Sequence, residues 1–259
     1  MTDDGRGPYF VQSLERGLSV IRAFTAETPE MTLAEVARTT GMSRAAARRF
    51  LLTLSDMGYM ATDGRLFRLS PRVLELGYSY LSSLSLAEIA APHLERLVAE
   101  VHESSSVAVL DGEDAVYVSR VPTRRIMTVS ISVGTRFPAY AASLGRVLLA
   151  GLPDDRLRRY LDSVSLAALT PKTITCTKTL ADELEQVRAR GWCLVDQELE
   201  EGLISIAAPI RDESRQVVAG VNLSTHVSRG TPDSIRRHLL PPLLATAASI
   251  EAELKVSGG

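Results

Sequence analysis

The sequence has little of what disulfide-stabilised, metal-binding and membrane proteins require. Its 259 residues include two cysteines, Cys176 and Cys193, which are too few for a disulfide framework and are expected to stay unpaired in a reducing cytoplasm. The four histidines are scattered and show no metal-ligand spacing. No apolar run approaches the length of a membrane span. These absences predict a cytoplasmic protein with no metal, no cofactor and no membrane partner.

Catalytic patterns are missing as well. The best candidate pair is Ser224 with the nearby His226, and a satisfied surface histidine explains that position more simply. A redox sensor would need Cys176 and Cys193, which fall in different predicted elements and carry no low-pKa signature. The chain is therefore predicted not to be an enzyme, with an enzyme or a redox sensor tethered to DNA kept as alternatives.

The most informative pattern lies in residues 32–69. Thr32 and Glu35 form a capping box, which predicts the start of a short helix. Gly41 comes where that helix must end and the chain must reverse, a position that favours positive φ. Ser43 is then a natural N-cap for a second helix. The apolar residues of that helix share one face at helical spacing: Ala47, Phe50, Leu51 and Leu54.

The second helix carries arginines on or near the face opposite its apolar residues. Arg44 lies at the N-terminal end, where recognition helices meet base edges. Arg48 and Arg49 lie further along and are expected to contact phosphates. A hairpin around Asp63-Gly64, a strong turn dipeptide, then forms a basic wing. The predicted DNA-contacting residues are Thr32, Ser43, Arg44, Ala45, Arg48, Arg49, Arg65 and Arg68.

The charge distribution agrees with this interpretation. Residues 31–72 hold seven arginines and three acidic residues, a net charge of +4, whereas the whole chain carries −2 and the remainder therefore −6. A basic segment on an otherwise acidic protein is the electrostatic pattern expected of a DNA-binding module. The alternative is a helical hairpin with a solvated arginine face, but the order of cap, turn glycine, basic helix and Asp-Gly hairpin favours a winged helix-turn-helix that binds double-stranded operator DNA.

The rest of the chain predicts a tail, a linker and a second domain. We expect a disordered polar tail over 1–10, which is no signal peptide, the winged helix-turn-helix domain over 11–70, and a linker helix over 71–85. The linker helix is either a dimer surface or an ordinary core helix. Residues 86–256 should form an α+β domain with a central antiparallel sheet. Its predicted helices are 86–103, 143–150, 180–190 and 231–254, and its predicted strands are 105–110, 115–121, 126–133, 193–196, 202–210 and 217–225. Pro241-Pro242 must kink or break the last helix.

Together these pieces resemble the IclR family of bacterial transcriptional regulators over nearly the whole chain. The resemblance implies a winged-helix domain, a GAF-like effector-binding domain for a small organic acid, and a dimer or tetramer. The opening residues 11–21 look most like regulators of the protocatechuate and β-ketoadipate branch. The residues that carry the resemblance are 13–21, 41–49, 134–138, 142–146, 201–203 and 220–224.

A helix that begins at Ser143 presents free backbone N–H groups to an incoming carboxylate, and Gly145 would let the ligand approach closely. Arg136 is the first candidate for the cation that binds the carboxylate, and Arg120 is the second. A surface salt bridge is the alternative for each. By resemblance, further polar side chains face the same cavity, which gives the predicted effector site Arg120, Arg136, Ser143, Leu144, Gly145, Asp196, Ser205, Asn222 and Ser224.

Pathway and effector are less closely defined by the sequence. Aromatic acid catabolism in the protocatechuate and β-ketoadipate branch is the favoured role, with another carboxylate pathway as the alternative. β-Ketoadipate, protocatechuate and 4-hydroxybenzoate are the candidate effectors, because the shape of the pocket decides among them.

Overall fold

The computed structural model describes residues 7, 9–76, 85–123 and 131–257, and the chain divides into two compact units, Met1–Ser82 and Ser83–Gly259. The predicted tail over 1–10 falls largely outside the described residues, which omit 1–6 and 8. The first helix, α1, begins at Gln12, where an acidic residue in the first turn, Glu15, complements the helix dipole.

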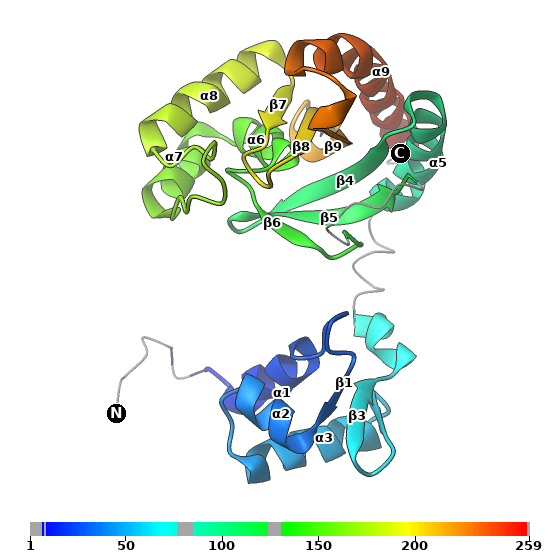
Figure 1. The fold of residues 1–259 in the computed structure, drawn as a ribbon, viewed down its shortest axis with the longest axis vertical. Helices are drawn as coiled ribbons and strands as arrows, with labels where there is room; N and C mark the ends of the chain where they lie inside the picture. The colour runs from blue at the N-terminus through cyan, green and yellow to red at the C-terminus, as the bar shows by residue number, and fades with distance from the viewer. Residues whose placement is uncertain (1–6, 8, 77–84, 124–130, 258–259) are drawn as a thin grey trace. The chain divides into compact units, whose positions relative to one another are not determined.

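The N-terminal unit is a winged helix-turn-helix, as predicted (Figure 1). Its antiparallel sheet has the strand order β1-β3-β2, and the short strand β1 was not predicted. The core lies between the helices and the sheet and includes Val20, Val36, Leu51 and Phe67. The elements are α1 (Gln12–Arg22), β1 (Glu30–Thr32), α2 (Leu33–Thr39), α3 (Arg44–Asp56), β2 (Met60–Thr62) and β3 (Leu66–Leu69).

The predicted linker helix begins as a tighter turn. Residues Pro71–Leu74 form a 3-10 helix, η1, and the side chain of Ser70 caps it by accepting a hydrogen bond from the N–H of Arg72 at 3.3 Å. Arg72 also donates to the carbonyl of Met57 at 3.1 Å and lies over the ring of Tyr59. These contacts join the start of the predicted linker to Met57 and Tyr59, which lie between α3 and β2. Most of the predicted helix, residues 77–84, lies outside the described residues.

The C-terminal unit is built on a six-stranded sheet in the order β6-β5-β4-β9-β8-β7, in which every pairing is antiparallel. This confirms the predicted central antiparallel sheet. The strands are β4 (Ser104–Asp111), β5 (Asp114–Val121), β6 (Arg136–Pro138), β7 (Cys193–Asp196), β8 (Leu203–Arg211) and β9 (Val217–His226).

Helices cover both faces of this sheet, as Figure 1 shows. On one face α5 (Ser85–Val101) and α9 (Pro232–Ser257) pack against β4, β5 and β8 around a core that contains Leu94, Ile206 and Leu243. On the other face lies α6 (Ser143–Ala150), backed by α7 (Asp154–Ser163) and α8 (Thr177–Arg190). All eight residues of α6 are buried. The strands between these layers are therefore apolar on both faces over most of their length.

The structure differs from the predicted elements in several places. Of the predicted kink or break at Pro241-Pro242, a break does not occur, because α9 continues through both prolines. The carbonyl oxygens of Arg237 and His238, each four residues before a proline, have no helical N–H group to accept from. Both residues are exposed, so water can donate these hydrogen bonds instead. Leu239 and Leu243 hold the helix in the core on either side. Helix α7 was not predicted. Of the predicted strand 126–133, residues 126–130 lie outside the described residues, and residues 131–133 are not strand.

Candidate functional site

The helix-turn-helix begins with the capping box that the sequence predicts. The backbone N–H of Thr32 donates to Glu35 Oε2 at 2.7 Å, and the N–H of Glu35 donates to Thr32 Oγ1 at 3.4 Å. These hydrogen bonds lower the pKa of Glu35, with the backbone N–H of Thr32 as the largest cause. The Thr32 hydroxyl also donates to the same carboxylate at 2.8 Å. The helix cap therefore explains the geometry of Thr32, and a role of Thr32 in DNA contact stays a prediction.

The turn and the second helix also follow the predicted pattern. Gly41 has a φ of +66°, in the region that favours glycine. The hydroxyl of Ser43 caps α3 by accepting from the N–H of Ala46 at 3.2 Å. Within the described part of the chain, the exposed arginines of this helix make no ion pair and no side-chain hydrogen bond: Arg44, Arg48 and Arg49. Ala45 is exposed beside them. This face is thus a row of unpaired cations, as a phosphate-binding surface needs.

The wing is fixed by its turn. Asp63 Oδ1 accepts from the backbone N–H of Leu66 at 2.7 Å and of Arg65 at 2.8 Å, and both hydrogen bonds lower the pKa of Asp63. Gly64 has a φ of +95°. The exposed Arg68 pairs with Glu30 at 3.5 Å, an interaction that contributes little at the surface and is easily exchanged for a phosphate.

The second unit holds a set of polar side chains on the sheet face that α6 covers. Register places Arg120, Ser106 and Asn222 side by side across three strands, and Ser205 opposite Ser224. Ser143, the first residue of α6, adds a polar side chain from the helix that covers this face of the sheet. The polar cluster, as we call it, consists of Ser106, Arg120, Ser143, Ser205, Asn222 and Ser224.

Hydrogen bonds link the buried members of the polar cluster. Asn222 Oδ1 accepts from the backbone N–H of Ser106 at 3.1 Å, and Asn222 Nδ2 donates to Ser224 Oγ at 3.1 Å. Ser205 Oγ donates to Ser143 Oγ at 2.8 Å, which ties β8 to the start of α6. The network fixes the amide of Asn222 and leaves hydroxyl groups that can still accept or donate.

Arg120 is the cation of the polar cluster. It is half-buried, and its Nη1 donates to Ser106 Oγ at 3.3 Å. Burial lowers its pKa. No carboxylate pairs with Arg120 among the described residues. A half-buried guanidinium without a carboxylate partner favours the binding of an anion.

Two predicted site residues lie elsewhere. Arg136 is exposed on β6 and donates to Asp111 Oδ2 at 2.7 Å and to Asp114 Oδ2 at 3.0 Å, which raises its pKa. Asp196 stands opposite Ile204, whose side chain belongs to the core on the other face of the sheet. The structure therefore does not bring Arg136 or Asp196 into the polar cluster. Arg136 pairs with two aspartates, and the side chain of Asp196 lies on the opposite face of the sheet.

A lysine partner also accounts for Asp196. Lys172 Nζ donates to Asp196 Oδ2 at 2.6 Å. Although burial opposes it, this hydrogen bond, with a second one from Gln197, lowers the pKa of Asp196. The carboxylate is thus stabilised where it stands, and a negative charge there needs no ligand to explain it.

The start of α6 has free backbone N–H groups, and its glycine, Gly145, has a packing role. The N-cap residue Ala142 provides no side-chain cap, so the first turn keeps N–H groups for a ligand. Leu144 is fully buried and offers only its backbone. A Cβ on Gly145 would lie 2.2 Å from the carbonyl oxygen of Ala139. The glycine is therefore needed for close packing of backbone on backbone, and its role in admitting a ligand stays a prediction.

Sequence reasoning missed a buried ion pair on the same helix. Arg146 is 1% exposed; its Nη1 donates to Glu198 Oε1 at 2.8 Å and its Nε to the carbonyl of Tyr140 at 2.7 Å. Glu198 Oε2 also accepts from the N–H of Ile174 at 3.1 Å. The available signal was a single charge in an otherwise apolar eight-residue helix, which requires a partner when buried.

The cysteines occupy contrasting sites. Cys193 is fully buried, and burial raises its pKa to about 12. Cys176 is exposed at the start of α8, where the N–H of Thr179 lowers its pKa. Both thiols are free, and the buried one is poorly suited to redox exchange. Over the described ranges, no group of three metal-ligating side chains is present. In the same ranges, no helix is long and apolar enough to span a membrane.

These two units define a class of protein. One unit is a winged helix-turn-helix with an arginine-bearing face, and the other holds a polar cluster next to the start of α6. This combination is that of a transcriptional regulator with a sensing domain. Residues 13–64 match the IclR helix-turn-helix domain, and residues 78–252 match the IclR C-terminal domain of bacterial transcriptional regulators. The chain belongs to the IclR family. It is a DNA-binding transcriptional regulator and not an enzyme.

Individual relatives support this membership. The Pca regulon regulatory protein of Pseudomonas putida is 47% identical over 244 residues, which cover 94% of this chain and 84% of that protein. The crystal structure of a proposed transcriptional regulator from Rhodococcus sp. RHA1 aligns with a TM-score of 0.85 at 57% identity, over 95% of this chain and 98% of that chain. A double mutant of the PobR inducer-binding domain from Acinetobacter, in complex with 3-hydroxybenzoic acid, aligns with a TM-score of 0.60 at 31% identity, over 64% of this chain and 97% of that chain. They confirm the predicted family and fold class.

Proposed function

We propose that this regulator controls aromatic acid catabolism in the protocatechuate and β-ketoadipate branch, and that its effector is a small organic acid bound at the polar cluster. The observation that carries the proposal is Arg120, a half-buried cation without a carboxylate partner among the described residues, on the strand next to Ser106, which in turn pairs with Asn222. The likeness to the Pca regulon regulatory protein supports the pathway. The aromatic acid in the PobR complex supports the ligand class.

In this proposal, three members of the polar cluster contact the effector: Arg120, Asn222 and Ser224. The effector carboxylate pairs with Arg120 and with the first-turn N–H groups of α6, where the helix dipole favours negative charge. Hydroxyl or keto oxygens of the effector then exchange hydrogen bonds with Ser224 and with the amide of Asn222. Protocatechuate, 4-hydroxybenzoate and β-ketoadipate all present a carboxylate with a second oxygen-bearing end, as this arrangement requires.

In the DNA-binding unit, α3 contacts the bases of the operator and the wing contacts its phosphates. Arg44 and Ala45, with Ser43, lie at the helix start that faces base edges, whereas Arg48, Arg49 and the wing arginines contact phosphates. In a dimer or tetramer the recognition helices meet major grooves about 34 Å apart or a multiple of that spacing. The effector changes operator affinity by binding one arrangement of the oligomer more tightly than another. Such a regulator acts in the cytoplasm, where the operator lies.

A thermal-shift series tests the effector assignment. At 100 times its dissociation constant, a ligand stabilises the folded state by about 2.7 kcal/mol, on the order of 5 to 10 °C in Tm. We expect such a shift with protocatechuate, 4-hydroxybenzoate or β-ketoadipate, and its loss in Arg120→Gln and Asn222→Ala. Arg136→Gln is the matched control, because this exposed arginine pairs with aspartates away from the polar cluster. An unchanged shift in both cluster variants would contradict the assignment, and no shift with any acid would direct the search to another carboxylate pathway.

A further inference from the structure

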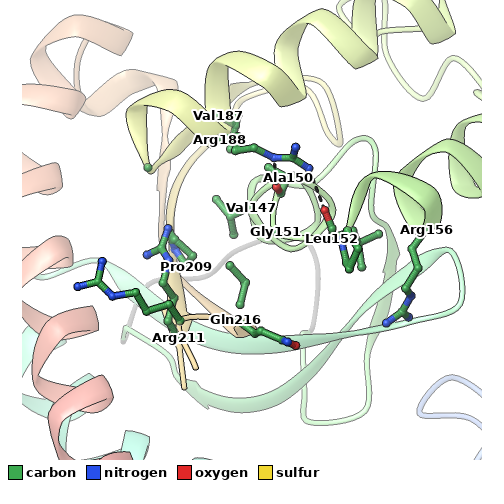
Figure 2. Close-up of a pocket in the computed structure, with 14 residues that line it drawn as sticks. Val147, Ala150, Gly151, Leu152, Arg156, Val187, Arg188, Pro209, Arg211 and Gln216 are labelled. Atoms are coloured by element: carbon green, nitrogen blue, oxygen red, sulfur yellow. Dashed lines mark hydrogen bonds between the residues drawn. The ribbon is translucent and has the colours of Figure 1, made fainter. Parts of the chain in front are cut away.

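A hollow lies at the opposite end of α6 from the polar cluster. It has a volume of about 420 Å³ and is formed where the end of α6 meets α7, α8 and the hairpin of β8 and β9. Figure 2 shows Arg156, Arg188 and Arg211 around Val147 and Gly151. Gly151, at the end of α6 where the hollow opens, lies roughly 12 Å along the helix from Ser143, and Val147 in its base lies roughly 6 Å from Ser143.

The base of the hollow is apolar and well packed. Val147 and Val187 are buried to 2% exposure, and Pro209 is buried beside them. Leu152 and Val217 complete the apolar lining. Gly151 brings α6 against β9 so closely that a Cβ there would lie 2.4 Å from the Cβ of Val217. These contacts make the base a fixed surface, complementary to a flat or short apolar group.

The edge of the hollow is cationic. Four arginines line it and, among the described residues that line it, none is acidic. Arg188 is already engaged with the carbonyls of Ala150 and Leu152 and with Asp154, and Arg211 lies 3.8 Å from Glu251. The remaining two, Arg156 and Arg215, are exposed and make no ion pair or side-chain hydrogen bond with any described residue.

We propose that this hollow is a second ligand site, distinct from the polar cluster, for a small organic anion with an apolar body, such as an aromatic carboxylate. Arg156 and Arg215 bind the carboxylate, Gln216 donates to it, and the ring rests on Val147, Leu152 and Val217. Arg188 does not bind the ligand directly. Its hydrogen bonds to the carbonyls of Ala150, the last residue of α6, and of Leu152 just beyond it offset the negative charge of the helix end, which would otherwise repel an anion.

Methyl NMR of the full chain, titrated with benzoate, tests this proposal. We expect the methyl resonances of Val147, Leu152 and Val217 to shift in a saturable manner. In the double variant Arg156→Gln/Arg215→Gln the apparent Kd at these methyls should rise by at least about tenfold, as loss of one charge-assisted hydrogen bond gives. The matched control Arg158→Gln/Arg237→Gln removes the same charge from exposed positions outside the hollow and should leave the Kd unchanged.

The outcomes separate this site from the polar cluster. If benzoate shifts the side-chain amide of Asn222 but none of the three methyls, the second site is overturned and the proposed effector site stands. If the methyls shift and Asn222 does not, the second site stands by itself. Equal weakening in both double variants would show a general charge effect and overturn the site. Inorganic phosphate bound as tightly as benzoate would overturn the requirement for an apolar body.

Discussion

The two units place arginine in opposite surroundings. In the N-terminal unit, Arg44, Arg48 and Arg49 are exposed and make no ion pair within the described residues. In the C-terminal unit, Arg146 is almost fully buried and makes a two-point pair with Glu198. An exposed cation without a partner stays available for phosphate, whereas a buried one with a carboxylate organises the fold around itself. Arg120 lies between these extremes, half-buried and hydrogen-bonded but lacking a described carboxylate partner, and this is why it suits a reversible ligand.

The largest expected effect comes from breaking the buried pair. Glu198→Ala leaves Arg146 charged and buried, so we expect the free energy of unfolding of the C-terminal unit to fall by about 3–5 kcal/mol. Urea unfolding, followed by the single tryptophan Trp192 in that unit, measures it. Glu198→Gln, which keeps the shape and an acceptor, should lose less. A loss within error of zero for Glu198→Ala would refute the contrast between buried and exposed arginines.

The close packing below α6 should give the next largest effect. In Gly145→Ala the new methyl meets the backbone of Ala139, and overpacking of this kind costs about 1–3 kcal/mol or more. Thermal unfolding of the two variants provides the comparison. Gly17→Ala is the control, since its Cβ meets nothing closer than Phe50 at 4.0 Å and alanine favours the helix. If Gly145→Ala is as stable as the control, the α6 contact is softer than its geometry indicates.

Within the DNA-binding unit, two arginines should differ in kind. Arg44→Ala should weaken operator binding by about 1–3 kcal/mol while affecting random DNA less, because a base contact is lost. Arg65→Ala in the wing should weaken all DNA about equally and reduce the salt slope by about one. Binding titrations on operator and random duplexes at several salt concentrations measure both. An equal loss from each variant on both duplexes would show that α3 and the wing do not divide these roles.

The smallest effect concerns pH. The pKa of Glu35 is lowered in the folded state by the hydrogen bonds from Thr32, so its contribution to stability is present above the unfolded pKa. That contribution disappears as pH falls through the lowered folded value. The stability difference between wild type and Glu35→Gln should therefore be constant near neutrality and shrink below the ordinary value of 4.5. A difference that stays the same down to pH 2 in acid-range unfolding curves would contradict the capping role.

The sequence predicts this molecule best where the interactions are local. The capping box at Thr32, the turn at Gly41 and the wing turn at Asp63 all join residues within four positions, and each has the predicted geometry. The antiparallel sheet followed because alternating segments and turn dipeptides are local signals as well.

Interactions between distant segments could not be predicted in the same way. Arg136 finds its aspartates 22 and 25 residues away, and Arg146 finds Glu198 52 residues away. The position of Asp196 outside the polar cluster has a local reason. Its neighbour Val195 pairs with Ser205, so counting alternate residues along β7 would have placed Asp196 on the other face.

The complete burial of α6 has a consequence for how new effector preferences arise. Since all eight of its residues are enclosed, a substitution in the helix disturbs packing on every side before it alters recognition. The strand positions around Asn222 and Arg120 can change with less disturbance, because part of their surroundings is polar. Laboratory evolution toward a different acid should therefore accumulate its changes on β4, β5 and β9 while the helix remains constant. Under the proposed function, α6 would keep the N–H groups that bind the carboxylate, and the strands would change the side chains that distinguish one acid from another.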